Sequence, residues 1–212
     1  MTSDEVLKIL EEAGAILTGH FVLKDNKHSN TYINKYVVVA HPQILSRLCL
    51  QVATIVADVG IKAVVAPTVA GVAMSQWVAH HLEQITGRPV LALYADETQD
   101  TRRVLRHGFD KLVRGKQVLV VDDTTTTGGT LTKVARAVKD CGGQAKAAAV
   151  LVNRGNVDYR DIRVDFLIWL AFVDLPSWPE EECPLCKQGV PINTEVGHGR
   201  EFLARKAKES NL

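Results

Sequence analysis

Two adjacent carboxylates, Asp122 and Asp123, stand between an apolar run and a stretch of hydroxyl side chains. The apolar run, residues 118–121, predicts a buried parallel strand, because continuous β-branched residues suit a strand that is covered on both faces. The acids would then lie at the carboxyl end of this strand, which is where open α/β sheets bind their ligands. We therefore expect both carboxylates to face a ligand.

A loop rich in threonine and glycine follows the acids: Thr124, Thr125, Thr126, Thr127, Gly128, Gly129 and Thr130. Apolar residues at positions 131, 134, 135 and 138 predict a helix directly after it. The unpaired N–H groups and the dipole of a helix N-terminus favour a phosphate dianion, so the whole run suits a sugar phosphate. The alternative is a strand-to-helix turn whose acids merely cap the helix, although capping needs only one acid or hydroxyl.

The same run resembles the phosphoribosyl pyrophosphate signature of the type I phosphoribosyltransferases: an apolar strand, paired acids, two variable residues and then Thr-Thr-Gly or similar. The two variable positions, usually aliphatic in that family, are Thr124 and Thr125 here. The resemblance implies that Asp122 and Asp123 contact the ribose hydroxyls, directly or through magnesium-bound water. It thus implies Mg²⁺ as the cofactor, held near these acids through substrate and water.

Composition favours a soluble enzyme domain. The 212 residues are 46% hydrophobic, which suffices for one core. The net charge of +1 gives no reason to expect nucleic acid or an anionic membrane as a partner. No apolar run approaches the roughly 18 residues of a membrane span. We expect a cytoplasmic protein, because the first residues lack signal-peptide features and the four cysteines are too scattered for a disulfide framework.

Helical and strand-like segments alternate along the chain. Strands are expected at residues 63–67, 90–94, 118–121, 147–152 and 166–171, and helices at 4–13, 41–58, 71–86 and 131–141. Such alternation predicts an α/β fold with a parallel sheet between helices. With the resemblance, we expect the type I phosphoribosyltransferase fold: a Rossmann-like sheet of about five strands and a small hood. The single domain would comprise a hood at 14–40, possibly with C-terminal residues, a core at 41–175 and a tail at 176–212.

The segment 19–34 is similar to the N-terminal segment of orotate phosphoribosyltransferases, where a Leu-Lys pair, a turn, a serine and aromatic residues form part of the hood over the base. By position, Lys24 would meet phosphoribosyl pyrophosphate, while Tyr32 and Ile33 would flank the base. The family often has two aromatic residues there, so stacking would rest on Tyr32. The alternative is a β-hairpin around residues 25–26 with a solvated lysine and histidine.

Thr68, Val69, Ala70 and Gly71 follow the expected strand 63–67. A tight turn that ends in glycine can aim backbone N–H groups at phosphate oxygens, so we expect a pyrophosphate loop here. The family frequently has a lysine at the position of Ala70. Without this charge, the loop would bind through its backbone and Thr68. A plain β-to-α turn is the alternative.

The polar segment 95–116 has no clear apolar period and contains a basic cluster: Arg102, Arg103, Arg106 and His107. Many orotate enzymes have an Arg-Lys pair just after the preceding strand, and Asp96 and Glu97 stand there instead. We expect the basic cluster to stabilise the negative charge of the leaving pyrophosphate, with His107 as a proton or hydrogen-bond donor. The segment would be mobile, and a solvated basic loop is the alternative.

Arg154 ends the expected strand 147–152, and in the resembled family an arginine at this place recognises the carboxylate of orotate. A planar guanidinium can hold a carboxylate through two parallel hydrogen bonds. Thr126 is a further expected contact to the base. A surface arginine at a strand end is the alternative.

Cys183 and Cys186 have the spacing of half a zinc knuckle, and His198 lies further along. Tetrahedral zinc needs four ligands, and the sequence holds no second Cys-x-x-Cys pair. We interpret the pair as a tail feature that some bacterial members of the family also have, with zinc binding and redox chemistry as the alternatives.

Together these segments imply an orotate phosphoribosyltransferase, a pentosyltransferase that makes orotidine 5′-monophosphate and pyrophosphate in pyrimidine synthesis. The resemblance implies that the C1–O bond loosens first and that a homodimer shares its mobile loop across the interface. Two alternatives stay open. One is a transferase for uracil, xanthine or hypoxanthine. The other is a non-catalytic phosphoribosyl pyrophosphate sensor that binds a protein partner, because about 15 residues before the hood leave no room for a DNA-binding extension.

Overall fold

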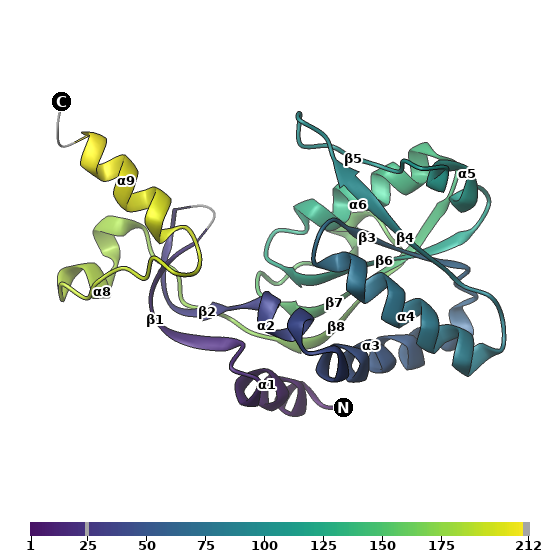
Figure 1. Ribbon diagram of the computed structural model, residues 1–212, viewed down its shortest axis with the longest axis horizontal. Helices are drawn as coiled ribbons and strands as arrows, with labels where there is room; N and C mark the ends of the chain where they lie inside the picture. The colour runs from purple at the N-terminus through teal and green to yellow at the C-terminus, as the bar shows by residue number, and fades with distance from the viewer. Residues whose placement is uncertain (24–25, 210–212) are drawn as a thin grey trace. The chain divides into compact units, whose positions relative to one another are not determined.

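The computed structural model describes residues 1–23 and 26–209 (Figure 1). They form two compact units: the sheet unit, residues 1–9 and 38–173, and the hairpin unit, residues 10–37 and 174–212. The hood segment that we expected at 14–40 thus groups with the C-terminal residues. Two helices cross the division, α1 (Ser3–Glu12) and α2 (Lys35–Ala40).

The sheet unit contains six strands in the order β5-β4-β3-β6-β7-β8. Five are parallel: β3 (Ala63–Pro67), β4 (Leu91–Glu97), β6 (Gln117–Thr125), β7 (Gln144–Asn153) and β8 (Phe166–Phe172). The short β5 (Arg103–Val104) pairs antiparallel with β4 at the edge. The predicted parallel sheet of about five strands between helices is therefore confirmed.

Helices cover both faces of this sheet. α6 (Gly129–Asp140) and α5 (Phe109–Val113) lie on one side, and α3 (Pro42–Val56) and α4 (Gly71–Thr86) lie on the other (Figure 1). The one-turn helix α7 (Tyr159–Ile162) and the 3₁₀ turn η1 (Ala57–Val59) complete the unit. Alternate residues of the central strands, such as Val118 and Val120, pack in one core with Leu131 and Val134 of α6. This alternation follows from the period of two along a strand.

The segment 95–116 differs from the prediction. It is not a polar stretch without structure, because β4 extends to Glu97, β5 pairs with it, and α5 follows. Leu105 and Val113 are buried in the core with α6 and anchor the segment. Ala95 lies in the same core and Phe109 packs against it, but these apolar residues are too widely and unevenly spaced to produce a recognisable period in the sequence.

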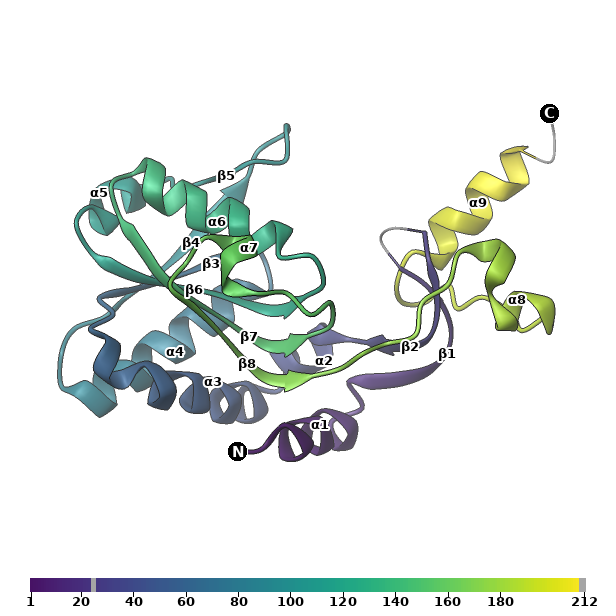
Figure 2. The same cartoon turned by 180° about the vertical axis from the view of Figure 1, so that it is seen from behind.

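The hairpin unit begins with the antiparallel pair β1 (Ile16–Val22) and β2 (His28–Ile33). A later segment returns to this hairpin: Trp178 forms an antiparallel bridge with His28. After it come η2 (Glu180–Glu182), α8 (Pro184–Lys187) and α9 (Gly199–Glu209), and both helices lie beside the hairpin in Figure 2. The hairpin that the sequence offered as an alternative is present, but its histidine is fully buried rather than solvated.

A membrane-crossing helix is not found among the described residues, since none of their helices combines the necessary length with apolar character.

Candidate active site

The two acids lie within β6 rather than after it. β7 pairs with β6 as far as Thr125, which keeps this end of the strand extended, whereas β3 pairs with β6 only as far as Val120. Asp122 and Asp123 therefore stand just past the end of the β3 pairing. Their exposed fractions are 7% and 4%. Such acids are held in place by the sheet, which suits carboxylates that position a ligand.

Hydrogen bonds fix both acids. The backbone N–H of Asp123 donates to Oδ1 of Asp122 over 2.9 Å. The hydroxyl of Thr124 donates to Oδ1 of Asp123 over 3.0 Å. Thr124, where the family usually has an aliphatic residue, thus orients one of the acids.

The threonine and glycine loop is folded in advance around the N-terminus of α6. Gly128 donates its N–H to the Thr125 hydroxyl over 3.1 Å, and Thr132 donates its hydroxyl to the Gly128 carbonyl over 2.9 Å. Gly128 has φ 74°, and a Cβ there would lie 2.9 Å from Val157, so a side chain is excluded on both grounds. The exposed loop residues are Thr126, Thr127, Gly129 and Thr130. They leave the positive end of a three-turn helix open to an anion.

The Arg154 turn is fastened to this loop. The N–H of Arg154 donates to the Thr125 carbonyl over 2.8 Å. The side chain of Asn153, 1% exposed, donates to the Val157 carbonyl over 3.0 Å and accepts from the N–H of Gly155 over 3.3 Å. A Cβ on Gly155 would lie 1.6 Å from the Thr126 carbonyl oxygen, so only glycine permits this approach. The half-buried Arg154 therefore sits beside the phosphate loop, a proximity that the sequence did not indicate.

The predicted pyrophosphate loop is a tight connection between β3 and α4. A Cβ on Gly71 would lie 3.0 Å from Cβ of Ala66 and 3.1 Å from Pro67, so glycine permits the close packing of helix and strand. Val69 is 83% exposed, while Ala70 is buried. A lysine at position 70 would start from a buried backbone position, and the loop takes its positive charge from elsewhere in the chain.

That charge is Arg103, whose side chain is 9% exposed. Its Nη1 donates to the Thr68 hydroxyl over 3.2 Å and approaches the carbonyls of Thr68 and Ala95 at 3.5 Å. Its Nη2 forms an ion pair with Glu97 at 2.9 Å. The β4–β5 pairing brings this guanidinium to the loop. The sequence assigned Arg103 to the pyrophosphate but did not indicate its contact with Thr68.

The rest of the basic cluster does not gather at the loop in the same way. Arg102 pairs with Asp100 at 2.6 Å, and its side chain is 75% exposed. His107 lies 3.8 Å from Asp96, with its ring beside those of Tyr94 and Phe109. Arg106 is exposed. The structure therefore brings only Arg103 of the four predicted residues into contact with the pyrophosphate loop.

Two predicted site residues, Tyr32 and Ile33, belong to the hairpin unit. Tyr32 is partly exposed and packs on Phe21, with ring centroids 5.5 Å apart. Ile33 is 5% exposed and offers little surface to a base. Lys24 lies outside the described residues.

A divalent cation fits the chemistry of the acid pair. Carboxylate oxygens are the ligands that Mg²⁺ prefers, usually one or two together with water and substrate phosphates. Asp122 and Asp123 supply such oxygens beside an open helix N-terminus. The donor set therefore matches Mg²⁺ held mainly through substrate and water.

A second group of possible metal ligands lies in the hairpin unit. His20, His28, Cys183 and Cys186 direct one ligand atom each into a common space, and all four atoms lie within 4.8 Å of one another. His198, the histidine noted after the cysteine pair in the sequence, is exposed and outside the group. The sequence did not reveal the two true neighbours, because they reach the cysteines through the hairpin.

Comparison with known sequences links the chain to one family. The model of the family described as phosphoribosyl transferase domain matches residues 53–181. An orotate phosphoribosyltransferase of Pelotomaculum thermopropionicum is 39% identical over 193 residues, which cover 90% of this chain and 95% of that protein. The enzyme of the same name from Thermotoga maritima is 31% identical over 196 residues, with 92% and 98% covered.

Solved structures agree in fold. An orotate phosphoribosyltransferase of Mycobacterium tuberculosis, in complex with Fe(III) dicitrate, has a TM-score of 0.64 at 21% identity and covers 80% of this chain and 95% of its own. An adenine phosphoribosyltransferase of Thermoanaerobacter pseudethanolicus has a TM-score of 0.58 at 18% identity, with 77% and 99% covered. Similarity of fold alone therefore does not separate one base from another.

Proposed function

The chain belongs to the phosphoribosyl transferase family, and we propose that it is an orotate phosphoribosyltransferase. It would transfer the 5-phosphoribosyl group from phosphoribosyl pyrophosphate to orotate, giving orotidine 5′-monophosphate and pyrophosphate for the synthesis of UMP. The observation that carries the proposal is the attachment of the Arg154 turn to the phosphate loop. This arrangement supports the proposal, because it would set a carboxylate-binding guanidinium beside a sugar phosphate site.

The sugar phosphate end is supported by the acids and the loop. The buried carboxylates of Asp122 and Asp123 would accept hydrogen bonds from the ribose hydroxyls. The exposed N–H groups before α6 and the hydroxyls of Thr126, Thr127 and Thr130 would hold the 5′-phosphate. Both elements are fixed in advance, so little ordering is needed when the substrate binds.

The base end is supported by Arg154. Orotate carries a carboxylate that uracil, hypoxanthine and xanthine lack, and a guanidinium can bind it through two hydrogen bonds. Thr126, whose carbonyl contacts the Arg154 turn, would border the same base. Tyr32 and Ile33 stay proposed base contacts, with Tyr32 the better candidate because it is more exposed.

The pyrophosphate end is supported by Arg103 and Thr68. As the C1–O bond loosens, negative charge accumulates on the leaving pyrophosphate and positive charge on the ribose. Arg103, held at the loop by the Thr68 hydroxyl, would stabilise the first of these charges. The two acids, close to the ribose, would stabilise the second. A bound Mg²⁺ would add positive charge at the ribose hydroxyls and pyrophosphate.

Catalysis in this scheme needs no covalent nucleophile, because positioning and charge stabilisation lower the barrier. Arg102, Arg106 and His107 would act on the pyrophosphate from the exposed part of the 95–116 segment. We also propose the Mg²⁺ requirement, a homodimer in which that exposed part serves the neighbouring subunit, and a cytoplasmic location. Arg103 would instead serve the site of its own subunit, since it contacts Thr68 of the same chain.

Turnover measured with separate bases tests the proposal. Orotate, uracil, hypoxanthine, xanthine and adenine are each offered with phosphoribosyl pyrophosphate and Mg²⁺. Orotate should be the preferred base, and Arg154→Ala should raise its KM by on the order of 30- to 1000-fold, as expected for losing about 2–4 kcal/mol of desolvated contact. The KM for phosphoribosyl pyrophosphate should change far less.

Arg136→Ala is the matched control, because its side chain is 82% exposed on α6. This control removes one positive charge without changing the Arg154 turn. It should leave the KM for orotate and the KM for phosphoribosyl pyrophosphate unchanged. Equal shifts of both constants in Arg154→Ala would remove Arg154 as the carboxylate-binding residue. Turnover of another base in preference to orotate would place the chain among the transferases for that base. Binding of phosphoribosyl pyrophosphate without turnover of any base would favour the sensor.

A further inference from the structure

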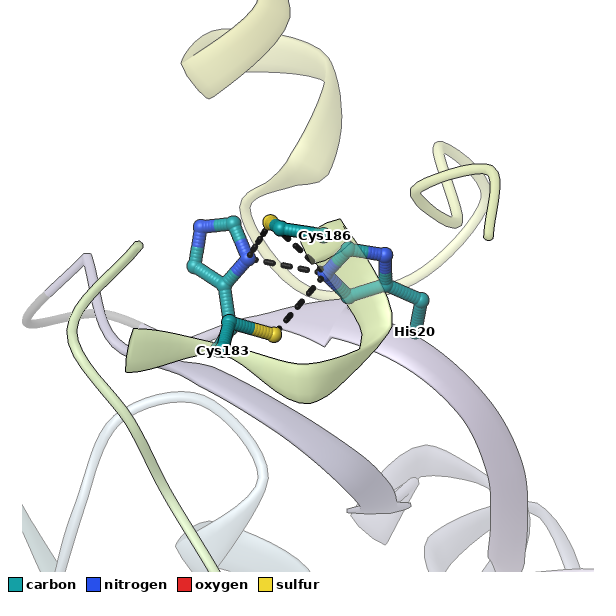
Figure 3. Close-up of side chains that lie close together, drawn as sticks. His20, Cys183 and Cys186 are labelled. Carbon is teal, nitrogen blue, oxygen red and sulfur yellow. Dashed lines mark hydrogen bonds between the residues drawn. The ribbon is translucent and has the colours of Figure 1, made fainter. Parts of the chain in front are cut away.

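The histidine and cysteine group of the hairpin unit is buried and comes from three separate segments. His20 lies on β1, His28 begins β2, and Cys183 and Cys186 flank the start of α8. His20, His28 and Cys183 are at most 2% exposed, and Cys186 is half-buried. Figure 3 shows the two sulfurs and the ring nitrogen of His20 directed toward one another. The phosphoribosyl transfer proposed above uses none of these residues.

The separations between the ligand atoms agree with a tetrahedral centre. Nε2 of His20 lies 3.6 Å from Sγ of Cys183 and 3.7 Å from Sγ of Cys186, and Nδ1 of His28 lies 3.3 Å from Sγ of Cys186. Tetrahedral zinc, with Zn–S near 2.3 Å and Zn–N near 2.0–2.1 Å, requires N···S separations of about 3.5 Å. The two nitrogens are 2.8 Å apart, and zinc requires about 3.3 Å. An adjustment of about half an ångström would therefore complete the site.

The hydrogen bond on the far side of His20 makes its ring suitable as a ligand. Nδ1 of His20 lies 2.7 Å from the carbonyl of Val190, which can only accept, so Nδ1 carries the proton. In the neutral ring, Nε2 then presents its lone pair to the other three ligand atoms. Metal-binding histidines are commonly fixed by such an outer hydrogen bond to a backbone carbonyl.

The backbone between and after the cysteines also suits a metal. Lys187 donates its N–H to the Cys183 carbonyl, and Gly189 donates to the Cys186 carbonyl with φ 68° at the glycine. These bonds close two tight turns that point both sulfurs to the same side. The bridge between Trp178 and His28 holds the segment in register with the hairpin.

We propose that His20, His28, Cys183 and Cys186 bind one Zn²⁺ ion as a structural site. Two thiols and two imidazoles are a ligand set typical of structural zinc, and all four positions are supplied by protein. Binding converts both thiols to thiolates and releases two protons, so the site with its metal is neutral. No oxidant or reductant is involved. The ion links the β1–β2 hairpin to the C-terminal segment within the hairpin unit.

The first experiment measures metal content and needs no variant. The whole chain is purified under reducing conditions, stripped with a chelator and reconstituted with zinc, and the metal is measured by mass spectrometry. About one zinc ion per chain is expected. Reconstitution with Co²⁺ should give the sulfur-to-cobalt charge-transfer absorption and the strong d–d bands of a tetrahedral thiolate site. Failure of the reduced, folded chain to retain zinc overturns the proposal.

Variants then test the ligands. Cys183→Ser with Cys186→Ser should remove the charge-transfer absorption and weaken zinc binding by more than the roughly 10- to 100-fold typical of losing an outer-shell partner. Cys141→Ser, in the sheet unit, is the control cysteine, and His198→Ala is the control histidine. Both should bind zinc as the unchanged chain does. Loss of zinc in either control, or its retention in the double serine variant, would contradict the assignment.

Two other states of the histidine and cysteine group would be distinguished by thiol titration and metal content. A Cys183–Cys186 disulfide would leave only two titratable thiols in the denatured, unreduced chain, instead of four, and no metal. A purely hydrogen-bonded group would give four thiols and no metal. Either result, if it persists after reduction and reconstitution, overturns the proposal. If the double serine variant does not fold, His20→Ala and the chelated wild-type chain still test whether the group binds zinc. Metal content and absorption are measured directly and do not depend on turnover.

Discussion

Gly155 offers the sharpest test of how the Arg154 turn positions the phosphate loop. In Gly155→Ala, the new Cβ would start 1.6 Å from the Thr126 carbonyl oxygen. Real Cβ atoms do not approach closer than 3.0 Å, so the turn and the loop must separate by at least 1.4 Å. A misplacement of about 1 Å at a reacting centre can cost on the order of 100-fold in rate. Strain of this kind typically costs about 1–3 kcal/mol of stability, occasionally more.

We therefore expect kcat/KM for phosphoribosyl pyrophosphate to fall by on the order of 100-fold in Gly155→Ala. The assay combines steady-state kinetics with the Kd of phosphoribosyl pyrophosphate by calorimetry, and thermal unfolding shows whether the variant is folded. Gly143→Ala is the matched control. Its Cβ would lie 2.8 Å from Val138 Cγ1, a clash at the other end of α6. The variant should therefore be less stable but should bind phosphoribosyl pyrophosphate as tightly as the unchanged chain.

Two results would refute this reasoning. One is a folded Gly155→Ala variant with normal kinetics, which would mean that the loop position does not govern the site. The other is an equal kinetic loss in Gly143→Ala, which would make the effect a general consequence of destabilisation. If Gly155→Ala does not fold, Asn153→Ala loosens the same turn without a steric clash or a buried charge, because it removes the bonds to the Val157 carbonyl and the Gly155 N–H.

Four further predictions address other parts of the molecule. Asp123→Asn keeps the side-chain shape in a buried position and should preserve the fold while lowering kcat by at least about 100-fold, measured with unfolding temperature alongside. Near-normal turnover would exclude Asp123 from the site. Arg103→Ala should raise the KM for phosphoribosyl pyrophosphate by about 10- to 150-fold, the equivalent of losing a charged hydrogen bond, and an unchanged KM would contradict its role at the pyrophosphate loop. Arg106→Ala with His107→Ala should lower kcat by on the order of 10- to 1000-fold, and mixing this variant with Asp123→Asn should restore part of the activity if subunits share sites. No recovery after verified subunit exchange would place these residues in their own subunit's site. Chelation of zinc should lower the unfolding temperature, because the site joins His28 to Cys186, 158 positions later in the sequence. Cross-links that close such loops stabilise proteins by up to about 4–5 kcal/mol. An unchanged unfolding temperature after complete metal removal would contradict a structural role.

The regular elements were the most predictable part of the fold. β3 and α4 have the bounds that the sequence predicts, since Pro67 and Gly87 mark their ends. β6 runs further than its apolar residues indicate, because pairing with β7 carries Asp122 and Asp123 along in the strand. The strand conformation of these polar residues is thus set by pairing with the neighbouring strand and not by their own propensity.

The candidate site likewise contains residues that local sequence indicates and residues that only the fold brings together. The phosphate loop and Arg154 were predictable, because each follows a strand directly and its neighbours are local in sequence. The sequence assigned Arg103 to the pyrophosphate, but its contact with Thr68 was not predictable, since a two-residue strand is too short to leave a pattern. The grouping of His20 with Cys183 was also not predictable, because it depends on pairing between segments 163 positions apart.

The hairpin unit is built from two segments that are far apart in the sequence, and this has a consequence for its synthesis on the ribosome. Residues 10–37 emerge before residues 38–173 of the sheet unit, but their partners, residues 174–212, emerge after them. At roughly 5–20 residues per second, the intervening stretch takes on the order of 7–27 s to translate. During that interval the sheet unit can begin to fold, whereas the nascent hairpin waits with His20 and His28 uncovered. A premature stop codon before position 174 would therefore release a chain whose hairpin lacks the Trp178 bridge and the Val190 and Phe202 contacts of His20 and His28, making it a natural substrate for chaperones or proteases.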